Sequence, residues 1–253
     1  MARTPSPPIV TPELMTRAAT IHERLCQTYG CPIPYFHSLD PMSELISSLL
    51  SHRTRNAESG RAFKQLRAIY PTWEAVIGAP TADVEAAINA VTWPELKAPR
   101  IQAILRQIRK ERGDLSLEFL KEMTVDAARA WLERLPGVGP KTSAAVLSFS
   151  VLRMAALPVD SHHHRVAERL ALIPPKTSLD KAHTLLAAQL PTDASPQHVY
   201  DNHEVLMLHG QRCCFYQNPA CHRCPVYDFC ATGHQRLHKN TDQAAAVKAN
   251  APT

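Results

Sequence analysis

Apolar residues recur along most of the chain at the three- and four-residue spacing of helices that are buried on one face. The first such stretch opens at Thr11-Pro12-Glu13, an N-cap followed by a first-turn proline and acid, and predicts a helix to about Tyr29. Prolines or glycines interrupt the pattern between the segments that follow. Further helices are predicted over 41–50, 59–70, 73–77, 81–91, 97–111, 125–134, 142–152, 161–173, 178–190 and 197–210.

One interruption, LPGVGP over residues 135–140, separates two helices that must pack closely. Its glycines permit positive φ and close backbone approach, and Pro140 suits the first position of a helix. The helix that follows is small and apolar and is expected to be buried. Two interpretations remain open: an ordinary glycine turn in a helical hairpin, or a hairpin whose Val138 and Gly139 N–H groups bind a phosphate beside the positive end of the helix dipole.

Two charged residues stand at predicted helix starts on either side of this hairpin helix. Lys141 lies in the first turn, where the dipole disfavours a positive charge, so its pKa is expected to be lowered and its neutral amine would be a nucleophile. Asp160 follows the extended pair Pro158-Val159 and precedes a helical pattern, which predicts an N-cap. A carboxylate that accepts helix N–H bonds stays ionised at neutral pH, so capping is compatible with catalysis.

Cysteines near the end of the chain have a spacing typical of a metal site, Cys214-x6-Cys221-x2-Cys224-x5-Cys230. Thiolates in such a loop hold either zinc or an iron-sulfur cluster. Structural zinc usually uses two short Cys-x2–4-Cys pairs, and only one pair is short here, so the spacing favours a cluster. Cys213 would lengthen the first gap; like Cys26 and Cys31 it is left as a thiol without an assigned role.

Composition constrains the function only weakly. The 253 residues carry 28 basic and 23 acidic side chains, which give a net charge of +5 and a pI near 8.9, a balance that permits DNA binding without requiring it. The opening residues contain neither a signal-peptide core nor a membrane span, so a cytoplasmic, nucleoid-associated protein is expected. In a reducing compartment clustered cysteines more often bind metal than form disulfides.

Taken together, LPGVGPKT, PVDSHHHRV and HG-x3-C-x6-C-x2-CP-x4-C resemble the helix-hairpin-helix DNA glycosylases of the endonuclease III family, over about residues 39–230. The resemblance implies an all-α, two-lobed fold. Residues 40–154 would form a six-helix bundle with the hairpin, and 12–39 with 155–230 the cluster lobe, between a disordered lead (1–11) and a flexible tail (231–253). It also implies a 4Fe-4S cluster bound by Cys214, Cys221, Cys224 and Cys230.

The same resemblance implies a bifunctional DNA glycosylase and AP lyase of base excision repair that removes oxidised pyrimidines from duplex DNA. Lys141 would attack C1′ of the damaged nucleotide and Asp160 would stabilise charge on the sugar. The partner would be double-stranded DNA with damaged bases or abasic sites, bound by a monomer in the cleft between the lobes, without a membrane. DNA contacts are implied for the hairpin residues Leu135, Gly137, Val138 and Gly139, and for His162 beside the aspartate.

Three departures from the family pattern affect the expected substrate range. Arg53 stands where the family carries a glutamine that fills the gap left by an extruded base; an arginine there is either a wedge in the DNA or part of a solvated helix end. Asn56 replaces a usual aspartate and Pro140 a usual basic or polar residue. These residues motivate an alternative, a DNA-binding paralogue with weak or only AP-lyase activity. A zinc-stapled helical module without enzymatic activity is a third hypothesis.

Overall fold

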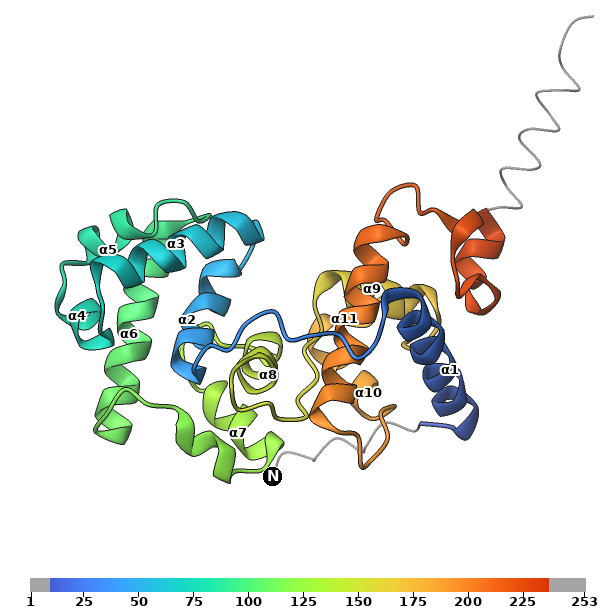
Figure 1. Cartoon of the computed structure of the whole chain (residues 1–253), viewed down its shortest axis with the longest axis horizontal. Coiled ribbons are helices and arrows are strands. Elements are labelled where there is room, and N and C mark those ends of the chain that lie inside the picture. The colour runs from blue at the N-terminus through green and yellow to red at the C-terminus, as the bar shows by residue number, and fades with distance from the viewer. Residues whose placement is uncertain (1–9, 237–253) are drawn as a thin grey trace, which may run out of the picture. The chain divides into compact units, whose positions relative to one another are not determined.

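The computed structural model describes residues 10–236, which form two compact units (Figure 1). Tyr35–Pro158 is called here the hairpin unit, and residues 10–34 with 159–236 the cysteine unit. All elements of secondary structure assigned within the described residues are helices, which confirms the all-α class. Residues 231–236, expected in the tail, are helical. The rest of the expected tail and residues 1–9 of the expected lead lie outside the described part.

The hairpin unit is built around α2 (Pro41–Ser51), of which nine of eleven residues are buried. Helices α3, α6 and α8 pack against it, so its nearly continuous apolar run PMSELISSLL is covered on several sides. Asp40 caps the helix by accepting a hydrogen bond from the N–H of Ser43 at 2.9 Å. The other elements are α3 (Asn56–Ile69), α4 (Trp73–Gly78), α5 (Thr81–Ala87), α6 (Pro94–Arg112), the 3-10 helix η1 (Glu118–Glu122), α7 (Val125–Leu132) and α8 (Pro140–Phe149).

Helix α6 begins at Pro94, three residues before the predicted start at Lys97. Trp93 precedes it at φ +56°, and this left-handed residue turns the chain so that Pro94 takes the first helical position. Lys97 is then buried in the first turn. Its ammonium donates to the carbonyls of Leu50 and His52 at 2.7 and 2.8 Å, and so ties the end of α2 to α6.

The cysteine unit consists of α1 (Pro12–Tyr29), α9 (Ser161–Arg169), α10 (Leu179–Ala187), α11 (Pro196–Arg212) and two 3-10 helices, η2 (Cys221–Arg223) and η3 (Tyr227–Phe229). Helix α11 packs against both α9 and α1. Thr11, Ser178 and Ser195 each cap a helix through a side-chain oxygen, and for Thr11 this confirms the predicted N-cap. Within the described residues no helix combines the length and the apolar character needed to span a membrane.

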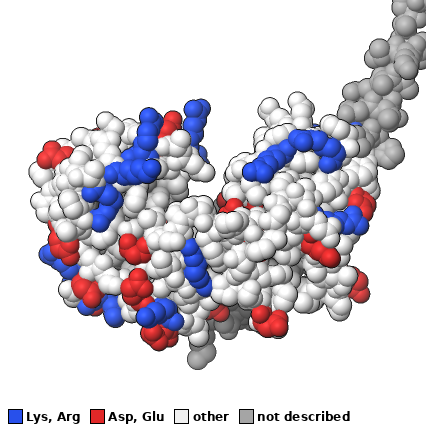
Figure 2. Space-filling model, viewed as in Figure 1, with Lys and Arg blue, Asp and Glu red and all other residues white. Residues whose placement is uncertain are grey.

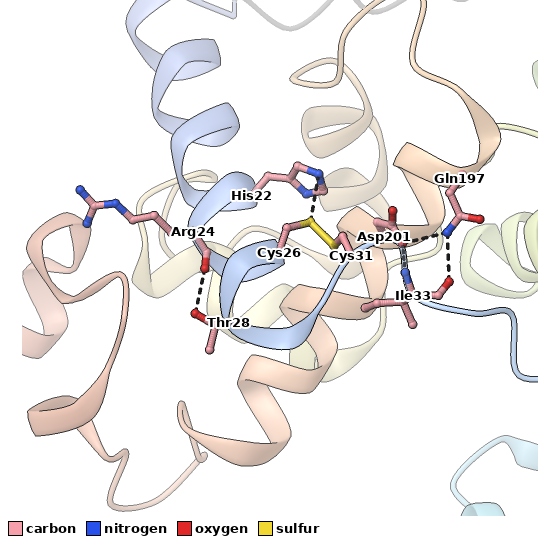
Figure 3. Close-up of a disulfide and its surroundings, with 8 residues drawn as sticks. All are labelled: His22, Arg24, Cys26, Thr28, Cys31, Ile33, Gln197 and Asp201. Carbon is pink, nitrogen blue, oxygen red and sulfur yellow. Dashed lines mark hydrogen bonds between the residues drawn. A yellow bond between two sulfur atoms is a disulfide. The ribbon is translucent and has the colours of Figure 1, made fainter.

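The prediction that Cys26 and Cys31 are thiols without a role was wrong, because these two residues form a disulfide (Figure 3). Gly30 ends α1 in the left-handed region at φ +85° and reverses the chain, which brings the two Cα atoms to 4.9 Å. Sequence spacing does not reveal this pairing, since the five-residue separation becomes a close approach only at the helix end. Beyond the disulfide, the carboxylate of Asp201 accepts from the N–H of Ile33 at 2.8 Å and holds this segment on α11.

A tight turn joins α7 to α8. The N–H of Val138 donates to the carbonyl of Leu135 at 3.1 Å, and Gly137 lies between them at φ +79°, the pattern of a type II turn. A Cβ atom on Gly137 would lie 2.7 Å from Cδ of Arg100, whose side chain crosses the turn. Gly137 is therefore favoured by its backbone angle, and the space it leaves lets the Arg100 side chain lie across the turn.

We predict that Gly137→Ala destabilises the protein by about 1–3 kcal/mol, because alanine resists positive φ and its Cβ would displace Arg100. Gly60→Ala in the exposed face of α3, where no atom lies within 4 Å, is the matched control and should stabilise by about 0.5–1 kcal/mol. Denaturant unfolding of both variants measures the difference. Equal stability of Gly137→Ala and the wild type would show that the turn is not constrained as described.

Candidate functional site

Lys141 is the second residue of α8 and is half-buried at the end of the helix where N–H groups lack helical partners. Of the two N–H groups predicted to be free, that of Val138 is not, because it closes the turn to Leu135. The N–H of Gly139 donates to no described residue. Leu135 and Val138 are 2% and 6% exposed, so their side chains belong to the core and the hairpin offers backbone to a ligand.

Cationic side chains gather at the start of α8. The ring of His52 lies 2.9 Å, Nε2 to Oγ1, from Thr142, the residue after Lys141. Burial, followed by the charges of Lys141, Lys97 and Arg100, lowers the pKa of His52 to about 4, so this histidine is neutral at pH 7. Arg100 is exposed and makes no ion pair with any described residue. This end of α8 therefore carries positive charge that an anion would neutralise.

Arg53 lies in a turn that has a left-handed backbone angle and is fixed by hydrogen bonds. Its φ is +51°, its carbonyl accepts from the hydroxyl of Thr92 at 2.9 Å, and the next residue, Thr54, accepts from Lys97 at 3.0 Å. The Arg53 guanidinium lies 5.9 Å from the ring centroid of Trp93, which is 47% exposed. The turn thus presents a cation and an aromatic ring together.

Basic residues continue from this turn along α3. Figure 2 shows Lys and Arg side chains gathered over α3 and the turn before it, a stretch that contains Arg53, Arg55, Arg61, Lys64 and Arg67. Asn56, the second departure noted in the sequence, is the first residue of this helix.

Asp160 is the N-cap of α9, as predicted, and its Oδ1 accepts from the N–H of His163 at 2.7 Å. The His163 ring behind it is fully buried, with its Nδ1 3.4 Å from that of His203 on α11. Glu204, also on α11, is buried, and its pKa is raised to about 7 by burial and then by the negative charges of Asp160 and Asp201. Asp160 is thus a capping carboxylate, and its negative charge contributes to the raised pKa of Glu204.

His162 links the start of α9 to the end of α11. Its Nδ1 accepts from the guanidinium of Arg165 at 3.1 Å, and Arg165 also donates to the carbonyls of Gly210 and Cys214. A Cβ on Gly210 would lie 2.8 Å from Cβ of His162, so only glycine lets the helices approach this closely. The position of Asp160 is in this way coupled to the cysteine loop.

The five free cysteines line one small cavity in the cysteine unit, together with Arg169 and His209. All four predicted ligands, Cys214, Cys221, Cys224 and Cys230, are among them. Cys213, which the sequence spacing did not include among the ligands, also lines the cavity.

The surroundings of the sulfur atoms fit an iron-sulfur cluster. Arg169 donates to the sulfur of Cys214 at 3.2 Å, and the N–H of Gly233 donates to that of Cys230 at 3.2 Å. Burial and then the neighbouring cysteines raise the pKa of Cys224 to about 12, so its thiolate needs a bound cation to persist. Iron supplies that charge, and N–H groups that donate to the sulfurs commonly surround such clusters.

Several of these residues were not found from the sequence. Arg100 could be recognised only once its side chain was seen to cross Gly137, and His52 lies 90 residues before its partner Thr142. Trp93 lies in the break between the helices predicted over 81–91 and 97–111. His209 carried the one available signal, because a histidine-glycine pair stands directly before the cysteine array.

Comparison with known proteins assigns the cofactor. The model of the iron-sulfur binding domain of endonuclease III matches residues 217–230. The cofactor of the cysteine cavity is therefore an iron-sulfur cluster, and the zinc interpretation is excluded.

The same comparisons identify the family. The model of the HhH-GPD superfamily of base excision DNA repair proteins matches residues 46–191, more than half of the chain. The chain is 34% identical over 169 residues to the Arabidopsis thaliana protein named "Putative DNA glycosylase At3g47830", of which it spans 56%. It is 31% identical over 192 residues to endonuclease III of Thermotoga maritima; this alignment covers 76% of the chain and 83% of that enzyme.

A solved structure shows the same fold. A trapped covalent intermediate of endonuclease III with DNA superposes with a TM-score of 0.74 at 24% identity, over 90% of this chain and all of that one. The fold, the family model over the hairpin and the iron-sulfur domain agree with one another. The chain therefore belongs to the endonuclease III family, within the HhH-GPD superfamily of base excision DNA glycosylases.

Proposed function

We propose that this protein is a bifunctional DNA glycosylase and AP lyase that removes oxidised pyrimidines from duplex DNA. The observation that carries the proposal is Lys141 at the positive end of α8, near the N–H of Gly139 and the guanidinium of Arg100, neither of which has a partner among residues 10–236. A DNA phosphate bound there would bring a sugar to the lysine. The endonuclease III of similar fold was trapped as a covalent intermediate with DNA, and covalent chemistry in that enzyme supports the proposal.

In the proposed reaction the Lys141 amine forms a bond to C1′ while the bond from C1′ to the base breaks, and the departing base takes the electron pair. The lysine nitrogen then loses a proton and the sugar ring opens to an imine. The imine acidifies the C2′ proton, and its removal expels the 3′ phosphate by β-elimination.

Asp160 has a separate proposed role in base release. Its hydrogen bond from the N–H of His163 orients the carboxylate, which would stabilise positive charge as it develops on the sugar and assist proton transfer. Lys141 belongs to the hairpin unit and Asp160 to the cysteine unit, and we propose that bound DNA engages both.

The role of Lys141 is tested by borohydride reduction in the presence of an abasic duplex. The wild type should form a covalent complex, and Lys141→Ala should lower the yield at least about 1000-fold, the scale of losing a catalytic nucleophile. Lys110→Ala, an exposed lysine in the last turn of α6, is the control and should react as the wild type does. Undiminished trapping by Lys141→Ala would remove the nucleophile assignment.

Asp160→Asn separates catalysis from helix capping. Asparagine caps a helix about as well as aspartate, so unfolding free energy should change by less than about 0.5 kcal/mol. Single-turnover release of thymine glycol from a duplex should fall about 100-fold or more, because the negative charge is gone. If the variant releases the base at the wild-type rate, Asp160 is a cap and nothing more.

Arg100 is tested by the salt dependence of binding. Arg100→Ala should reduce the slope of log K against log salt by about 0.9, the contribution of one neutralised phosphate. Arg109→Ala in the last turn of the same helix should leave the slope unchanged. An unchanged slope for Arg100→Ala would place this side chain away from the DNA, whereas a flat response of the wild type would count against phosphate binding altogether.

Arg53, Asn56 and Pro140 favour a second candidate, a DNA-binding paralogue with weak or only AP-lyase activity. Pro140 contributes no N–H at the first position of α8, and the Arg53 turn carries a cation where the family pattern has an amide. Wild-type protein that processes abasic duplexes but leaves thymine glycol in place would favour this candidate. Release of the damaged base at a comparable rate would favour the bifunctional enzyme.

A further inference from the structure

Cys213 places a fifth sulfur at the cluster cavity. It is 5% exposed, and its Sγ, the Sγ of Cys224 and a ring nitrogen of His209 all lie within 4.8 Å of one another. Its thiol donates to the carbonyl of Ala220 at 3.6 Å, across the loop that leads to the next ligand. The residue therefore faces the same space as the four predicted ligands.

Cys213 and Cys214 share one turn. Helix α11 ends at Arg212, and the N–H groups of both cysteines donate to the carbonyl of His209, at 3.0 and 2.7 Å. Because the two residues are consecutive, their Cα atoms are about 3.8 Å apart. Either sulfur can thus be supplied to the cavity by a local change at the end of α11.

The contacts of the two sulfurs differ in kind. Cys214 Sγ accepts a charged hydrogen bond from Arg169 at 3.2 Å, which favours a thiolate and hence a metal ligand. Cys213 Sγ points to a carbonyl oxygen, which can accept only from a protonated thiol. In the native protein Cys214 is accordingly the better ligand, and Cys213 is held beside it as a thiol.

We propose that Cys213 is a reserve ligand of the iron-sulfur cluster, able to bind the iron that Cys214 binds when the sulfur of Cys214 is lost. In this exchange the thiol of Cys213 gives its proton to solvent and its sulfur bonds to the open position on iron, with no change in oxidation state. Cys221 and Cys230 have no such neighbour, because no cysteine stands next to either of them in the sequence.

Four full-length variants test this: Cys213→Ser, Cys214→Ser, the double variant and Cys221→Ser. Iron bound per chain and the visible absorption of the cluster are measured on each purified protein, so the readout does not depend on DNA repair activity. Cys213→Ser and Cys214→Ser should both keep the cluster. The double variant and Cys221→Ser should hold at least about tenfold less iron, because each leaves one position without a thiolate.

Each outcome is decisive. Loss of iron from Cys214→Ser, whether the protein stays folded or not, overturns the proposal. Equal iron in Cys214→Ser and the double variant also overturns it, because something other than Cys213 would then complete the cluster. Retention in Cys214→Ser with loss in the double variant supports it, even if Cys221→Ser proves tolerant.

Discussion

A positive charge at the start of a buried helix is the constraint around which the hairpin unit is arranged. Residues 142–149 of α8 are all buried, so the helix cannot shift to relieve unfavourable charge at its first turn. Lys141 nevertheless lies there, and burial, followed by the charges of Lys141, Lys97 and Arg100, lowers the pKa of His52 and keeps it neutral. Such an arrangement is unfavourable in isolation and becomes favourable when an anion binds, which supports the proposed phosphate site.

In the cysteine unit the unfavourable charge is negative and is carried by buried thiolates. Buried thiolates repel one another, and the raised pKa of Cys224 shows that the fold alone does not stabilise the charged form. Arg169 donates to the sulfur of Cys214, and a ring nitrogen of His209 lies 3.5 Å from that of Cys224. The hydroxyl of Tyr29, 3.0 Å from Nδ1 of His209, fixes this ring. Cluster binding is therefore coupled to the packing of α1, α9 and α11, and through Arg165 and His162 to the helix that Asp160 caps.

The helices, the capping role of Asp160 and the gathering of the four spaced cysteines at one cavity were predictable from the sequence, because each depends on local pattern or fixed spacing. Contacts between distant segments were not. The disulfide of Cys26 and Cys31 depends on the reversal at Gly30, and the bond that occupies the Val138 N–H depends on the turn type adopted by Gly137. Arg100 was not predicted because its contact with the hairpin also joins distant segments. In the sequence it is one of several arginines in a basic helix.

The position of the Arg100 side chain across the hairpin affects how the proline at position 140 is interpreted. A basic side chain at the first position of α8 would reach a phosphate from the hairpin itself, and proline removes both the charge and an N–H. Arg100 reaches the same turn from α6, and the absence of side-chain bulk at Gly137 is what lets it lie there. The charge missing from one element is thus present on another. Pro140 by itself is consequently weak evidence for lost DNA binding, and the turn of Arg53 and Trp93 is the more informative departure for substrate range.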